Sequence, residues 1–178
     1  SSNAGSVYVN GGLVYWAGEE FIKAYTASLW RDGTLAMLSD RYSSAKSVYA
    51  DGNNIYVGGT EYGVGGRIWK NGQVMPLSYP AGTGSSEINS VRAAGRAAYA
   101  AGSAYITGTN HVAVYWKNGP PVMLTDGAAR AGGAAVYLSG RDLYVAGYAT
   151  YAPAPIITQL WPHTPPLSLS THPNTPPA

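Results

Sequence analysis

The sequence of 178 residues contains no cysteine, a single phenylalanine and few charged residues. Without cysteine there is no disulfide scaffold, no thiolate nucleophile and no thiolate metal site, although a repeat β-protein can be secreted without disulfides. Charged residues make up 11% of the chain, against about 25% in ordinary soluble domains. No apolar run approaches the ~18 residues of a membrane-spanning helix, so we expect no membrane span.

The small net charge of +2 comes from basic residues that are scattered singly along the chain. No basic run could follow a phosphate backbone, so we expect no nucleic-acid partner. The three histidines, at positions 111, 163 and 172, have no i,i+4 spacing and form no zinc motif, and Glu19 and Glu20 point to opposite sides if they lie on a strand. The sequence therefore predicts no catalytic residues, no cofactor and no metal, and a protein that is not an enzyme.

Glycine and tyrosine are abundant instead, with 23 and 15 residues respectively. Both are weak helix formers, and tyrosine favours strands. This composition excludes a coiled coil and a helical bundle.

Four 13-residue blocks align without gaps and share a valine, a central glycine, a tyrosine and a final glycine. The blocks are residues 6–18, 47–59, 90–102 and 135–147. Each block reads as a strand, a turn at the central glycine and a second strand. The second strand is apolar at successive positions, as in Ile55-Tyr56-Val57, and such a strand must be covered on both faces.

A second block follows in each unit, in which a tryptophan lies eight residues before a leucine. The turn of this hairpin is Asp32-Gly33, Asn71-Gly72 or Asn118-Gly119, dipeptides that suit a two-residue turn with positive φ. The fourth copy has His163-Thr164 after Pro162, so its turn must differ.

The repeats predict an all-β fold, a β-propeller-type array of four four-stranded antiparallel repeats, with four blades if it closes within the chain. The small residues Ala17, Gly58, Ala101 and Ala146 would let neighbouring sheets approach closely. We expect an N-terminal extension or tag remnant at residues 1–5 and a Pro-rich tail at residues 171–178. Between them we expect four repeats, at residues 6–46, 47–89, 90–134 and 135–170.

The motifs Tyr56-Val57-Gly58-Gly59 and Ile68-Trp69-Lys70-Asn71-Gly72, followed by Leu77, carry a resemblance to known repeats. The chain resembles bacterial extracellular repeat families with a Y-V-x-G … W-x-N-G-x-x-x-x-L pattern, such as HAF-type repeats and Bacteroidetes surface repeats. The resemblance implies a secreted or surface-displayed propeller-like protein, and it brings no catalytic residues.

The connections after the second and fourth strands take nearly all the length variation, which predicts one face of variable loops. Variable loops on a rigid scaffold are where binding usually resides, and tyrosine offers a rigid ring with a hydroxyl group. The alternative is that these tyrosines only close the loops over the core. The candidate binding residues are Tyr25, Tyr42, Tyr62, Tyr79, Tyr105, Tyr148 and Tyr151.

Two functions of different kinds follow from these patterns. The first is a structural or assembly subunit of a surface or fibre, which associates with itself or with another surface protein. Its Pro-rich tail either reaches a neighbouring subunit as an extended arm or is a disordered end or linker. The second is a glycan- or protein-binding module that uses the tyrosine-rich loop face. In both cases we expect a secreted or cell-surface protein whose signal peptide is not in this sequence.

Overall fold

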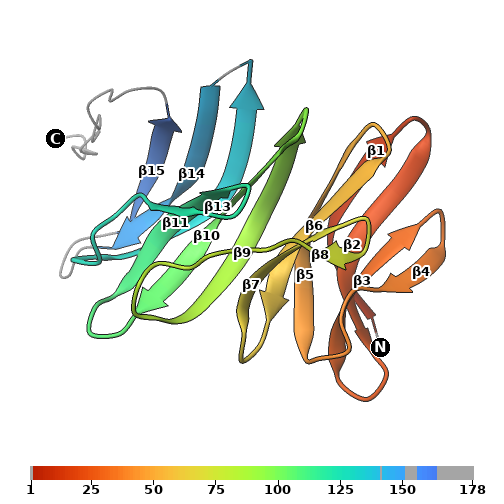
Figure 1. Ribbon diagram of the computed structural model, residues 1–178, viewed down its shortest axis with the longest axis horizontal. Helices are drawn as coiled ribbons and strands as arrows, with labels where there is room; N and C mark the ends of the chain where they lie inside the picture. The colour runs from red at the N-terminus through yellow and green to blue at the C-terminus, as the bar shows by residue number, and fades with distance from the viewer. Residues whose placement is uncertain (1, 141, 151–155, 164–178) are drawn as a thin grey trace, which may run out of the picture.

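The fold is that of a computed structural model, which describes residues 2–140, 142–150 and 156–163 (Figure 1). Three sheets have four strands each, and the described part of the fourth has three, with every pair of neighbours antiparallel. The first two sheets comprise β1 (Ser2–Asn10), β2 (Leu13–Phe21), β3 (Tyr25–Arg31), β4 (Thr34–Met37), β5 (Ser43–Asp51), β6 (Asn54–Glu61), β7 (Gly65–Lys70) and β8 (Gln73–Val74). The other two comprise β9 (Thr83–Ala94), β10 (Ala97–Ile106), β11 (His111–Lys117), β12 (Pro121–Met123), β13 (Arg130–Ser139), β14 (Asp142–Thr150) and β15 (Ile156–His163).

The four sheets, called blades 1 to 4 in chain order, stack face to face like an open fan (Figure 1). Their first strands β1, β5, β9 and β13 lie side by side where the blades converge. A hydrophobic core fills each of the three spaces between successive blades. The predicted all-β, propeller-type array is therefore confirmed, and its described residues form an open arc.

The tight turns follow the predicted chemistry. Asp32, Asn71 and Asn118 all have positive φ, and each is followed by a glycine with positive φ. Their side chains also accept hydrogen bonds of 2.8 Å from the backbone N–H groups of Val14, Ile55 and Ala98, at the start of the second strand. The turn thus fixes the register of three strands at once. The fourth copy, with its predicted different turn, lies mostly outside the described residues.

A bulge in the first strand of each blade explains the final glycine of the first block. The register shifts by one residue after Ala4, Ala45, Ile88 and Gly133. At this point a carbonyl oxygen of the first strand lies against the glycine of the second strand, so close that a Cβ atom would stand 1.9 Å from it at Gly18, Gly59 and Gly102. No other residue fits this position without movement of the backbone.

One serine in each of blades 1 to 3 joins that blade to the next, beside these bulges. The hydroxyl oxygens of Ser6, Ser47 and Ser90 accept hydrogen bonds from the backbone N–H groups of the valines one blade further along: Val48, Val91 and Val136. The same contact therefore occurs at all three boundaries. The expected close approach of the blades also occurs, because a Cβ atom on Gly58 would stand 2.8 Å from Ile88 of blade 3.

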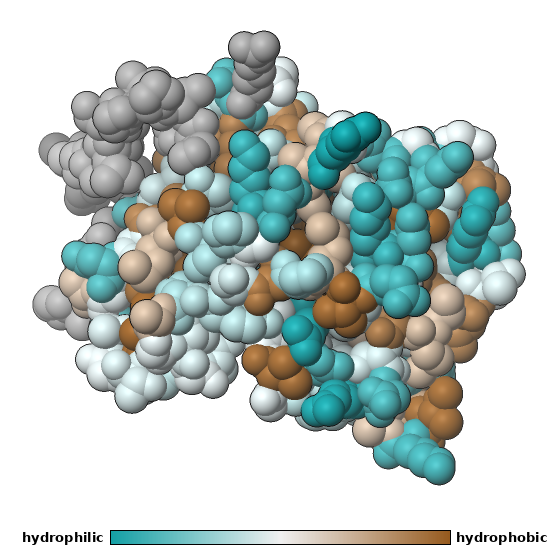
Figure 2. Space-filling model, in the orientation of Figure 1, coloured by the Kyte–Doolittle hydropathy of each residue, from teal (hydrophilic) through white to brown (hydrophobic). Residues whose placement is uncertain are grey.

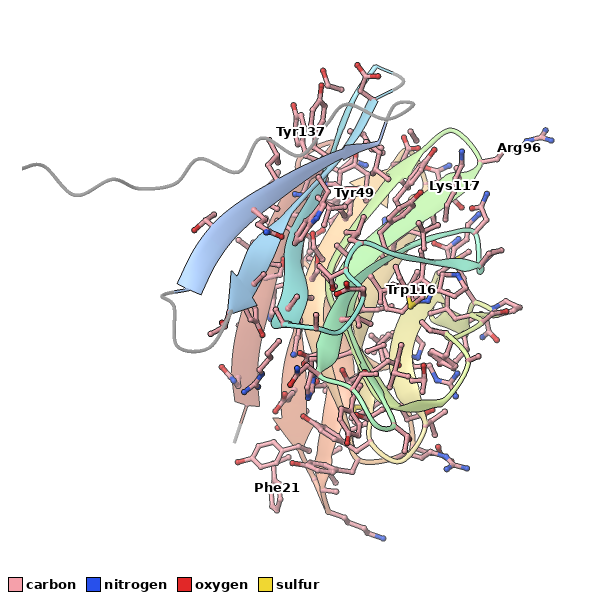
Figure 3. The ribbon with its side chains drawn as sticks, turned by 90° about the vertical axis from the view of Figure 1, so that its left-hand side faces the viewer. Phe21, Tyr49, Arg96, Trp116, Lys117 and Tyr137 are labelled. Atoms are coloured by element: carbon pink, nitrogen blue, oxygen red, sulfur yellow. The ribbon has the colours of Figure 1, made fainter. Side chains whose placement is uncertain are left out.

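The two ends of the strands form different surfaces, seen at the top and bottom of Figure 3. Arg96 and Tyr137 mark the end with the short turns, called the turn face, and Phe21 marks the opposite end, called the loop face. The side of the molecule shown in Figure 2 carries small, separate hydrophobic and hydrophilic patches.

The predicted boundaries need one correction. Residues 2–5 belong to β1 and so are not an extension separate from the first blade. Similarly β5, β9 and β13 begin at Ser43, Thr83 and Arg130, inside ranges that we assigned to the preceding repeat. These segments pair with the ends of the second strands, so the true loops are shorter than the variable segments of the sequence.

Candidate functional site

Five of the predicted tyrosines are exposed, and four of them lie on the loop face of blades 1 to 3. Tyr42 and Tyr62 stack on each other with ring centroids 4.4 Å apart, and Tyr105 lies 5.4 Å from the ring of His111. Tyr25, on blade 1, packs against Phe21 instead. The structure therefore brings Tyr62 and Tyr105 to blades 2 and 3, and leaves Tyr25 apart.

The other predicted tyrosines have different roles. Tyr79 is partly buried against the core, and its hydroxyl group donates a hydrogen bond of 2.9 Å to the carbonyl oxygen of Gly66, so it closes a loop as the alternative interpretation supposed. Tyr148 is partly exposed on blade 4 and packs against Gly132. Tyr151 and the Pro-rich tail at residues 171–178 lie outside the described residues.

A cleft of about 290 Å³ opens on the loop face between blades 2 and 3. It is called the interblade cleft, and its volume is at the lower end of the range for ligand sites. One wall comes from the connection between β6 and β7, the opposite wall from the ends of β9 and β10. Its residues are Thr60, Glu61, Tyr62, Gly63, Val64, Gly65, Gly84, Ser85, Ser86, Glu87, Ser103, Tyr105 and His111.

Two carboxylates lie in this cleft, and basic groups hold both in place. Glu61 accepts hydrogen bonds from Ser39 at 2.7 Å and from the guanidinium group of Arg67 at 2.9 Å. Glu87 accepts them from the amino group of Lys46 at 2.6 Å and from Ser103 at 3.1 Å. Since Lys46 extends from β5 of blade 2 to Glu87 of blade 3, it also ties the two blades together.

Both carboxylates are stabilised in the ionised form. Burial alone would raise the pKa of Glu61, but hydrogen bonds from Ser39 and Arg67 outweigh it and hold the pKa below its usual value. The pKa of Glu87 is also lowered, because Lys46 and Ser103 outweigh the effect of burial. A carboxylate has about four lone-pair positions. The side chain of Glu87 is 41% exposed and can accept further hydrogen bonds from a ligand, whereas that of Glu61 is only 9% exposed.

Blade 1 carries an uncovered hydrophobic face. Val7 is 66% exposed, whereas Val48, its equivalent in blade 2, is 1% exposed because blade 1 covers it. Val9 and Leu35 are also exposed on this face, and Trp16 and Trp30 stack there, partly buried. This surface is called the blade 1 end face.

Blade 4 has an uncovered face of the other kind. In blades 1 to 3 the equivalent face is covered by the next blade along the chain. Leu160 is 59% exposed, whereas Ile68, its equivalent in blade 2, is 1% exposed beneath blade 3. Ala135 and Tyr137 are exposed on the same face, next to Ala146 and Tyr144. This surface is called the blade 4 end face, and with the blade 1 end face it repeats the two halves of a blade boundary.

Further features of the described residues can be stated briefly. A second depression, of about 610 Å³, lies between blades 1 and 2 and is lined partly by the turn residues Asp32, Asn71 and Gly72. No three histidine, aspartate or glutamate side chains of the described residues are grouped so that they could hold a metal ion. None of their secondary structure is a helix long and apolar enough to cross a membrane.

Sequence reasoning did not identify Glu61, Glu87, Ser103 or His111 as site residues. Glu61 lies in blade 2 and the other three in blade 3, and the four share no column of the alignment, so the stacking of blades 2 and 3 brings them together. One signal was available: acidic residues are scarce, and Glu61 directly precedes Tyr62 in a variable segment.

No family model matches the sequence, and no curated protein matches it. Among solved structures, the fold is similar to that of an α-L-arabinofuranosidase from Clostridium thermocellum ATCC 27405, with a TM-score of 0.51 and 11% identity over 91% of this chain and 68% of that chain. An acylaminoacyl peptidase from Pyrococcus horikoshii aligns with a TM-score of 0.49 and 15% identity over 87% of this chain and 25% of that chain.

The arabinofuranosidase is a β-propeller. Together with the stacked four-stranded sheets, this similarity defines the chain as an all-β protein of the β-propeller type. At 11% identity the likeness concerns the fold alone.

Proposed function

We propose that this protein is a non-catalytic structural subunit of the cell exterior, and that its copies assemble by packing the blade 4 end face of one on the blade 1 end face of another. The observation that carries the proposal is the exposure of Val7 and Leu160 at positions that are buried in every other blade. Large exposed apolar patches mark interaction sites.

The partner we infer is a second copy of the chain, because surfaces equivalent to the two end faces already pack on each other within one chain. At each of the three blade boundaries, the equivalent of the blade 4 end face on one blade packs on the equivalent of the blade 1 end face on the next blade. A joint between two different surfaces is head-to-tail, and it yields a ring if the rotation closes and a filament if it does not.

The carboxylates of the cleft bear on one catalytic role only. A general acid needs a raised pKa, whereas Glu61 and Glu87 both have lowered pKa values, so neither is suited to act as a general acid. The location at the cell exterior rests on the resemblance to surface repeats and on the scarcity of charge.

Light scattering coupled to size-exclusion chromatography over a wide concentration range tests the assembly. We expect the fraction of dimers or larger species to rise with concentration, and Val7→Asp and Leu160→Asp each to hold the protein monomeric. The matched control is Val74→Asp, which changes an exposed valine on the outer strand β8 of blade 2 and should leave the association unchanged.

Mixing the two monomeric variants distinguishes a head-to-tail joint from any other. The Val7→Asp copy keeps an intact blade 4 end face and the Leu160→Asp copy an intact blade 1 end face, so an equimolar mixture should form heterodimers. If the unmodified protein stays monomeric at every concentration, or if the mixture does, the proposal is wrong.

A further inference from the structure

We infer that the interblade cleft is a binding site for a neutral, hydroxyl-rich ring, such as a terminal sugar unit of a glycan. This inference is independent of the assembly proposal, because the cleft lies between blades 2 and 3 and includes no residue of either end face.

The aromatic walls are the first reason. Tyr62 and Tyr105 face the cleft from opposite blades, and each is supported by a second ring: Tyr42 stacks on Tyr62, and His111 packs beside Tyr105. A ring held by a neighbour loses little conformational entropy when a ligand binds. Such rings suit the flat C–H face of a sugar, with the phenol groups left to bond its hydroxyls.

The carboxylates are the second reason. Glu61 and Glu87 are ionised and already aligned by Ser39, Arg67, Lys46 and Ser103. Hydrogen bonds in which the acceptor is charged are about twice as strong as neutral ones. Ligand hydroxyls that donate to the exposed carboxylate of Glu87 would be recognised in fixed directions.

The charges of the cleft also select against other ligands. An anionic group such as a phosphate or a uronate would meet two carboxylates, and the described residues that line the cleft include no lysine or arginine to bind it. A cation would compete with Arg67 and Lys46, which already pair with Glu61 and Glu87. A neutral ligand with many hydroxyls meets neither difficulty.

Two of the glycines that line the cleft differ in how well they would accept a side chain. A Cβ atom on Gly65, whose φ is +134°, would stand 2.7 Å from the hydroxyl oxygen of Ser86. Gly84 is different: its backbone is extended, and a Cβ atom there would meet Tyr105 at an ordinary contact distance of 3.5 Å. A valine at position 84 therefore suits the strand while it narrows the cleft, which makes it a suitable blocking variant.

Saturation-transfer NMR followed by calorimetry tests the inference, with cellohexaose, xylohexaose, mannohexaose and maltohexaose as neutral probes and an oligogalacturonate as the anionic probe. We expect at least one neutral probe to bind and the anionic probe not to bind. Tyr105→Ala and Gly84→Val should each weaken binding at least tenfold, and Tyr105→Trp should retain it because stacking is preserved.

Tyr25→Ala is the matched control, since Tyr25 and Tyr105 are 39% and 38% exposed on the same loop face and only Tyr105 lines the cleft. Circular dichroism and the urea midpoint of each variant separate a lost site from a lost fold. The inference is overturned if no neutral probe binds, if the oligogalacturonate binds equally well, or if both Tyr105→Ala and Gly84→Val, while folded, bind like the unmodified protein.

Discussion

At the scale of single residues, two of the nine acidic side chains of this chain lie where blades 2 and 3 meet. Glu61 is tied to Ser39 and Arg67, and Glu87 to Lys46 and Ser103. Both carboxylates have a pKa below its usual value, because these bonds outweigh the effect of burial. A lowered pKa in the folded state links the stability of the protein to pH.

The sign of this link follows from the ionised form. A carboxylate whose pKa is lower in the folded than in the unfolded chain stabilises the fold fully above its unfolded value, near 4.5 for Glu61, and loses that contribution as the pH falls through the folded value. We therefore predict that the destabilisation caused by Glu61→Gln is largest at pH 7 and shrinks toward pH 3.

Urea unfolding of both proteins at pH 7, 5, 4 and 3 measures this difference. Asp40→Asn, which changes an exposed carboxylate on the loop between β4 and β5, serves as the control. A difference between Glu61→Gln and the unmodified protein that stays constant from pH 7 to pH 3 would contradict the prediction.

At the scale of the strand pair, the bulge and its facing glycine form the unit that each blade repeats. Because a Cβ atom on Gly59 would stand 1.9 Å from the carbonyl oxygen of Ser44, Gly59→Ala must push the first strand away from the second. We predict a loss of about 3 kcal/mol or more in the free energy of unfolding, at the upper end of the cost of overpacking.

Gly52→Ala is the informative comparison, since Gly52 has a positive φ of 57° but open space around it. Its cost should be only that of the left-handed backbone, about 1–2 kcal/mol. Chemical denaturation of the two variants measures both values, and equal losses would show that the bulge tolerates a side chain.

These elements also show why the sequence predicts some features and not others. The turn at Asn71 and the columns of valine and glycine are local patterns that recur four times, and so they predict the strands and the turn conformation. The bulge at Lys46 leaves no mark on composition, although it explains the glycine. The cleft depends on which variable segments the stacking of the blades brings together. The sequence pattern gives Tyr79 and Tyr105 the same status as candidate binding residues, but the side chain of Tyr79 turns inward and donates a hydrogen bond to Gly66.

At the scale of the whole molecule, each end face of the open arc is a surface that the other blades bury against a neighbouring blade. A boundary formed between two copies would differ from the three boundaries within the chain in its serine contact. Ser6, Ser47 and Ser90 each bond the valine of the next blade, but blade 4 has Ala135 at the equivalent position. In the proposed assembly, the N–H of Val7 in the second copy would meet a methyl group there.

Ala135→Ser should therefore strengthen the association of copies. One restored hydrogen bond contributes about 1 kcal/mol, which corresponds to about a fivefold lower Kd, and sedimentation equilibrium measures the change. Ala134→Ser, at the adjacent exposed bulge residue, is the control and should leave the Kd unchanged, and the urea midpoint at low protein concentration should not move for either variant. Only the proposed joint brings Val7 of one copy to residue 135 of the other. If both serines change the Kd equally, or if Ala135→Ser leaves the Kd of an associating protein unchanged, the copies join elsewhere than at the blade boundary.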